Sequence, residues 1–340
     1  MMQRSTLTSL ACLALLAGAC SGDDTGGGDA SASSTTAQTT STSSTSATSE
    51  STSTSTTTGD ATTTTTSTTS TTTASSESDT DTDTDSTTGE AAAEAFRFTK
   101  INVRDPHFYI VPIIGCEDIT DKDLLAIQAV NKQFNAAVQG DLSDPPDGLL
   151  DMNFVLLFRP TLDQNGAGGA MEFITGECTA PIETTSCDIL DGTSPSPTSY
   201  SNMADGTCFT PNPGELTAMY APKPGPTTGP CFAGDPLSFT LNLGTFQLPF
   251  EDATIAAQYM GDPADGMVQG NIHGFVSEEV ANTTLLPMDI PVLGGKPISE
   301  LLPGGTKNCA KHDDRDMNDG TSGWWFFIEF EAARVPYTGP

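Results

Sequence analysis

A long low-complexity stretch near the N-terminus limits what this chain can fold into. Residues 30–90 are almost entirely Ser and Thr, and they include no aromatic and no large aliphatic side chain. Such a segment has no apolar surface whose burial could offset the conformational entropy lost on folding. We therefore expect a disordered linker over residues 20–90. As a flexible coil it would reach on the order of 40 to 50 Å.

The segment before the linker has the features of an export signal. Arg4 precedes an apolar run over residues 7–16, and three small residues stand directly before Cys20. The run is too short for a membrane-spanning helix, which needs about 20 residues. The sequence around Cys20 resembles the lipobox of bacterial lipoproteins, which implies a signal peptide over residues 1–19 and a lipid attached to Cys20. An ordinary signal cleaved after Ala19, with no lipid, is the alternative.

The same resemblance implies a location. In bacterial lipoproteins a Ser after the lipidated cysteine, here Ser21, favours sorting to the outer membrane. We expect an outer-membrane lipoprotein that is held to the membrane by its lipid and faces the periplasm or the cell surface.

Residues 91–340 are long enough to form a single globular domain with one core. They carry 33 of the chain's 44 acidic residues, against 12 Lys and Arg. Nucleic acid and anionic lipid both require a basic surface, so this balance argues against either as a partner. An unknown protein or a glycan is the ligand we expect.

Six cysteines fall within this domain, and an even number in an oxidising compartment predicts three disulfides. Six cysteines allow 15 connectivities. Short loops favour two of the bridges, and the third would join the ends of the domain. The favoured pairs are Cys178 with Cys187, Cys208 with Cys231, and Cys116 with Cys309.

Hydrophobic periodicity predicts a mainly β domain, similar to a β-sandwich, with one substantial helix and disulfide-pinned loops. Apolar residues recur at helical spacing over about 120–139, where Thr120 is a candidate N-cap and Gly140 ends the pattern. Residues 179–230, rich in Pro, Gly, Ser and Thr, are expected to form a surface excursion. Short helical turns are expected near 278–282 and 298–302. Alternating apolar residues predict strands near 237–243 and 246–250. Apolar or β-prone segments predict further strands near 96–103, 153–158 and 324–332, and a hairpin formed by 254–259 and 267–276.

Two acidic clusters predict calcium as a cofactor. Asp314, Asp316 and Asn318 place oxygen-bearing side chains at alternate positions, which resembles the start of an EF-hand-type loop. Asp319 stands where that motif needs Gly, so an exposed turn is the alternative. Asp147 and Asp151 preserve the second half of such a loop, although prolines interrupt its first half. Calorimetric titration with calcium would test both loops.

The sequence assigns no catalytic residue. It contains no nucleophile elbow, zinc-protease motif, phosphate-binding loop or dinucleotide fingerprint, and only three histidines. We therefore expect a non-enzymatic, lipid-anchored display domain that binds a protein or glycan. The alternatives are a structural envelope component and a secreted, glycosidase-like hydrolase that uses carboxylates and carries structural calcium.

Overall fold

The computed structural model describes residues 93–339 except 113, 125–126, 244–246 and 289–292. The predicted signal peptide, Cys20 and most of the predicted linker therefore lie outside the described residues. Among the described residues, no helix is both long enough and apolar enough to cross a membrane.

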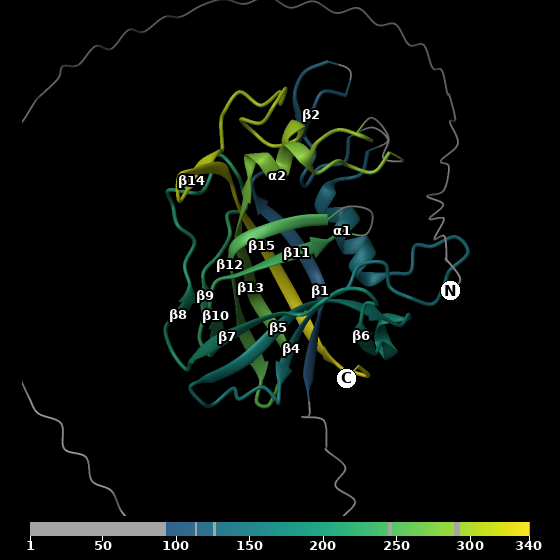
Figure 1. Ribbon diagram of the computed structural model, residues 1–340, viewed down its shortest axis with the longest axis vertical. Coiled ribbons are helices and arrows are strands. Elements are labelled where there is room, and N and C mark those ends of the chain that lie inside the picture. Colours follow the sequence, from purple (N-terminus) through teal and green to yellow (C-terminus); the bar gives the residue numbers. More distant parts are fainter. Residues whose placement is uncertain (1–92, 113, 125–126, 244–246, 289–292, 340) are drawn as a thin grey trace, which may run out of the picture. The chain divides into compact units, whose positions relative to one another are not determined.

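Eight of the described strands form an antiparallel sheet that closes on itself (Figure 1). Their order is β1-β4-β5-β7-β10-β12-β13-β15, and β15 pairs in turn with β1. The closing pair joins the two ends of the domain, since Ala95 lies opposite Val335. The strands are β1 (Glu94–Asp105), β4 (Phe154–Arg159), β5 (Gly168–Cys178), β7 (Ser196–Met203), β10 (Cys231–Gly234), β12 (Gln247–Gly261), β13 (Ala264–Ser277) and β15 (Thr321–Val335).

The described residues also form shorter strands and four helices. β6 (Cys187–Ile189) pairs with β5, β11 (Leu237–Asn242) with β12, and β14 (Asp316–Asn318) with β15. Two small ribbons join β2 (Tyr109–Ile110) to β3 (Glu117–Asp118), and β8 (Thr207–Phe209) to β9 (Thr227–Thr228). The helices are α1 (Val130–Gln139), α2 (Glu278–Thr283), η1 (Ile182–Thr184) and η2 (Ile298–Glu300). The mainly β class and both short helical turns are confirmed.

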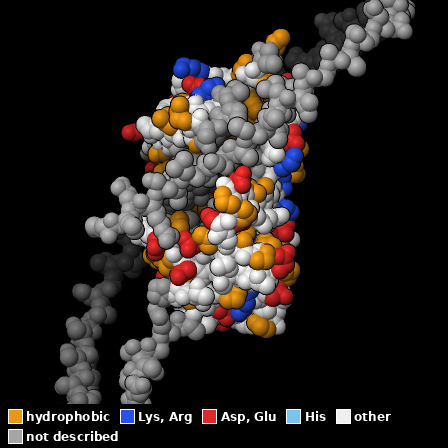
Figure 2. Space-filling view, turned by 90° about the vertical axis from the view of Figure 1, so that its right-hand side faces the viewer, with side chains coloured by type: hydrophobic (Ala, Val, Ile, Leu, Met, Phe, Trp, Pro, Cys, Tyr) orange, Lys and Arg blue, Asp and Glu red, His pale blue; other side chains and the backbone are white. Residues whose placement is uncertain are grey.

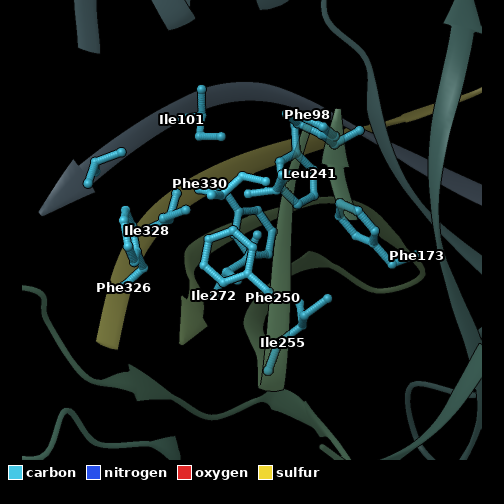
Figure 3. Close-up of a cluster of buried hydrophobic side chains, with 14 of the residues drawn as sticks. Phe98, Ile101, Phe173, Leu241, Phe250, Ile255, Ile272, Phe326, Ile328 and Phe330 are labelled. Atoms are coloured by element: carbon cyan, nitrogen blue, oxygen red, sulfur yellow. The ribbon is translucent and has the colours of Figure 1, made fainter. Parts of the chain in front are cut away.

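The inner face of the sheet encloses the core (Figure 3). Phe98 and Phe330, from neighbouring strands β1 and β15, stack with ring centroids 4.1 Å apart. Leu237, Phe239 and Leu241 are buried, while the residues between them are exposed, as their alternation predicted. Figure 3 shows side chains from several strands pointing toward one another. Each large apolar side chain buried in this way contributes about 1.5 to 3 kcal/mol to stability.

The single substantial helix is shorter than predicted, because it begins at Val130 and not near Thr120. The Thr120 hydroxyl accepts a hydrogen bond from the Phe108 N–H, and the Asp123 carboxylate accepts one from the Ala129 N–H. These local bonds hold residues before 130 in a loop, a conformation that competes with the helix.

Helix α1 completes one edge of β1. Only Glu94–Arg97 of that strand pair with β4. Beyond this point the side chain of Asn131 bonds both the N–H and the C=O of Val103, at 2.7 and 2.9 Å. Asn135 does the same for Ile101, at 3.2 and 2.8 Å. Two amides on successive turns of the helix therefore replace the hydrogen bonds of a missing neighbouring strand.

The structure forms the three disulfides that the spacing favoured: Cys116–Cys309, Cys178–Cys187 and Cys208–Cys231. The expectation of a surface excursion over 179–230 is wrong in part, because β7 belongs to the closed sheet, between β5 and β10. Tyr200 of β7 is buried in the core. The sequence pattern did not predict β7, because polar residues surround Tyr200, its one buried apolar residue.

Candidate functional site

Residues 206–230, here called the cover segment, lie against the outer face of β13 and β15. The Phe209 ring packs near His273 and Phe327, and the Thr227 hydroxyl donates to the Gln269 carbonyl at 2.7 Å. The Gly225 N–H donates to Glu329 at 3.1 Å. The disulfide Cys208–Cys231 ties the two ends of the cover segment together.

A groove of about 480 Å³, with both apolar and hydrogen-bonding groups in its lining, lies between the cover segment and the outer face of β1, β15 and β13. This volume falls in the range of about 300 to 1,000 Å³ that small-molecule sites occupy. The side chains that line the groove and carry hydrogen-bonding groups are Lys100, Asn102, Thr228, Gln269, Asn271, Glu329 and Glu331.

Each charged side chain that lines the groove is paired with an opposite charge, and Arg104, the partner of Glu329, lies outside the groove lining. Lys100 Nζ lies 2.8 Å from Glu331 Oε1, and Arg104 Nε lies 2.6 Å from Glu329 Oε2. Elsewhere acidic side chains dot the surface, as the face drawn in Figure 2 shows. The groove therefore differs from the rest of this acidic domain in having little net charge.

Two residues on the floor of the groove are held at an energetic cost. Gln269 has φ +47°, the left-handed region, at a bulge of β13 opposite β15. Asn271 is 2% exposed; its Nδ2 donates to Thr227 Oγ1 at 2.9 Å, whereas its buried Oδ1 has no hydrogen-bond partner among the described residues. A buried acceptor without a partner costs about 1 to 3 kcal/mol. Bulges and strained residues of this kind occur often beside binding sites.

The chain's three histidines all contact the cover segment. The rings of His107 and Tyr220 stack with centroids 3.8 Å apart, and the Tyr220 hydroxyl lies 2.9 Å from His312 Nε2. His273 Nε2 lies 2.9 Å from Glu215 Oε2, and burial lowers the pKa of this histidine. These contacts, here called the polar seam, join His107, His273 and His312 to Tyr220 and Glu215 of the cover segment and hold it in place.

The two adjacent tryptophans face opposite ways, because successive side chains along a strand alternate between its two faces. Trp324 is buried and donates from Nε1 to the Pro303 carbonyl at 2.9 Å. Trp325 stacks against the imidazole of His273, with centroids 4.4 Å apart. Neither indole forms part of the groove lining.

Asp105 is the most perturbed carboxyl of this seam. It is 3% exposed, and its Oδ2 accepts a hydrogen bond from the Thr217 N–H at 2.8 Å. Burial raises the pKa of Asp105 to about 8, and the nearby charges of Asp314 and Asp316 add to the rise. At pH 7 this raised pKa favours the protonated form of Asp105.

Of the predicted calcium ligands near the C-terminus, the structure brings two into this acidic region. Asp314 accepts a hydrogen bond from the Thr217 hydroxyl, and burial raises the pKa of Asp316, with Glu215 and Asp314 contributing. Asn318 instead donates to Asp252 at 2.7 Å.

In the second predicted loop the carboxylates bond to the loop's own backbone. Asp147 accepts from the Leu149 N–H at 2.9 Å, and Asp151 accepts from the Leu142 N–H. Burial raises the pKa of Asp151, and the charges of Asp141 and Asp147 contribute. Within the described part of the chain, no three His, Cys, Asp or Glu side chains are grouped to hold a metal ion. Calcium binding at either loop stays a prediction.

Comparisons with protein-family models, with curated proteins and with solved structures return no match to this chain. The site therefore has to be interpreted from its own chemistry. Sequence reasoning did not find the groove, because its residues occupy ordinary outward positions of three strands. The one sequence signal for the groove residues was the alternation of inward and outward side chains on those strands.

Proposed function

We propose that this chain is an exported, lipid-anchored binding protein whose domain binds a neutral, hydroxyl-rich glycan in the groove beside the cover segment. The anchor is the lipid on Cys20, and the location is the outer membrane, facing the periplasm or the cell surface. The observation that carries the proposal is the groove, which presents amide and carboxylate side chains with their charges already paired.

The chemistry of the groove suits hydroxyl groups. A sugar hydroxyl both donates and accepts, so it matches a surface that mixes amides such as Asn102 and Gln269 with carboxylates such as Glu331. Because the ion pairs leave little net charge, a ligand gains nothing there from carrying a charge of its own. These features favour a neutral glycan over a charged ligand.

Strand addition by a peptide is disfavoured at this site. β13 is flanked by β12 and β15, and β15 by β13 and β1. The groove-lining part of β1 is flanked by β15 and by the amides of α1. No strand under the groove offers an unpaired edge, so recognition has to use side chains.

The hydrolase alternative gains no support from the described residues. A glycosidase needs a protonated carboxyl within reach of the glycosidic oxygen. Asp105, whose raised pKa favours the protonated form at pH 7, is buried beneath the cover segment and does not line the groove.

Calorimetric titration of the full mature chain with a panel of neutral oligosaccharides tests the proposal. We expect saturable binding to at least one of them, and we expect Glu331→Ala to weaken that binding at least tenfold. Glu177→Ala is the matched control, because Glu177 is an exposed glutamate on β5, outside the groove. Absence of binding across the panel, or equal affinities of the two variants, would overturn the proposal.

A further inference from the structure

A second hollow adjoins the groove beside the cover segment. It has a volume of about 590 Å³ and lies at the beginning of α1, where Asp121, Lys122, Asp123 and Lys132 line it. Asn102 lines both the groove and this hollow. The two depressions therefore meet at one side chain on β1.

The register of the strands makes this junction part of a straight row. Glu329 on β15 lies opposite Asn271 on β13 and opposite Asn102 on β1. Neighbouring strands are about 4.8 Å apart, so these three residues span about 10 Å across the sheet. The row continues onto α1, because Asn135 Nδ2 donates to Asn102 Oδ1 at 3.1 Å.

The second hollow resembles the groove in its electrostatics. Lys132 Nζ lies 2.7 Å from Asp123 Oδ2, so oppositely charged groups again neutralise each other. Three of the domain's 12 basic residues, Lys100, Lys122 and Lys132, line the two hollows. Both hollows therefore present hydrogen-bonding side chains whose charges are paired.

From this continuity we infer that the site binds an extended stretch of a neutral glycan chain, with one part in the groove, another in the second hollow, and Asn102 between them. The inference rests on the proposed function. A ligand of a single sugar would touch only one of the hollows, whereas a chain lying along the row would use both.

Calorimetric titration of the full mature chain with oligomers of increasing length, all built from the one neutral sugar that binds, tests this inference. We expect affinity to rise at least tenfold with length and then to level off once both hollows are filled. Lys122→Ala should weaken binding of the longest oligomer about threefold to tenfold and leave the shortest unchanged. Asn102→Ala should weaken both.

Lys311→Ala is the matched control, because Lys311, like Lys122, is an exposed lysine, but it lines neither hollow. Constant affinity along the series, or an equal effect of the two lysine variants on the longest oligomer, would overturn the inference. If affinity stayed constant along the series but Glu331→Ala still weakened binding of the shortest oligomer, the extended site would be contradicted and the proposed function would stand. Tighter binding of an acidic oligomer of equal length would overturn the neutral character of the ligand.

Discussion

At the scale of single residues, Asp105 connects the seam around the cover segment to the stability of the domain. Its pKa is raised to about 8 by burial, from the ordinary value of 3.8. Below pH 4 the carboxyl is protonated in both the folded and the unfolded chain, so it has no effect. Between pH 4 and about 8 only the unfolded chain releases the proton, so stability falls as pH rises, by up to about 1.4 kcal/mol per pH unit. Above pH 8 the loss is complete.

Asp105→Asn removes this titration and keeps an oxygen that accepts from the Thr217 N–H. We expect the free energy of unfolding of the variant, relative to that of wild type, to increase by on the order of 2 kcal/mol or more when the pH is raised from 5 to 8. Urea unfolding at the two pH values measures the difference. Asp191→Asn, at an exposed position, should show no such gain. A gain of the same size at pH 5 and pH 8 would contradict the assignment to Asp105.

At the scale of elements, α1 illustrates what sequence patterns capture and what they miss. The alternation at Leu237, Phe239 and Leu241 predicted a strand correctly, because each position has one consistent environment. The apolar spacing of Leu124 and Ile127 also fitted a helix, but Thr120 and Asp123 accept hydrogen bonds from the Phe108 and Ala129 N–H groups, and these residues form a loop. The first bond joins residues 12 apart in sequence, which the apolar spacing within 120–139 does not encode.

The groove was beyond prediction for a related reason. Asn271, Glu329 and Asn102 lie far apart in sequence, and only the order and register of β13, β15 and β1 align them. The disulfides needed less information, since short loops singled out two bridges and left two cysteines for the third. A site formed by strand order requires the fold to be known first.

The attachment of α1 to β1 gives a testable energetic expectation. Asn131 is 4% exposed and satisfies both backbone groups of Val103. Asn131→Ala leaves those groups without partners, so we expect the free energy of unfolding to fall by about 2 to 3 kcal/mol. Lys132→Ala on the same helix removes only an exposed ion pair and should cost less than about 1 kcal/mol. Chemical denaturation measures both, and equal losses would argue against the bridging role of Asn131.

At the scale of the whole molecule, the two ends of the described domain lie together. The chain enters the described domain at the start of β1, and its C-terminus lies at the same end of the sheet (Figure 1). The lipid anchor proposed at Cys20 would thus reach the domain through β1, with α2 and β2 at the opposite end.

Replacement of Cys20 by serine tests that anchor. We expect the natural chain to partition into detergent and to begin at a Cys20 that carries added lipid mass, whereas Cys20→Ser should remain in the aqueous phase. Cys12→Ser is the matched control, because Cys12 lies within the predicted signal peptide and its loss should leave the anchor intact. Mass spectrometry of the N-terminal peptide provides the measurement. An unmodified N-terminus at another residue in the natural chain would contradict the anchor.

The pairing of Ala95 with Val335 makes closure of the sheet depend on the last strand of the domain. Synthesis from the N-terminus onward delivers β15 last, and until then β1 and β13 each lack one neighbouring strand along most of their length. Joining segments so distant in sequence carries a large loop-closure entropy and is slow. A partly synthesised copy therefore exposes the unpaired edges of β1 and β13 until the residues of β15 arrive, and exposed strand edges favour association with other chains.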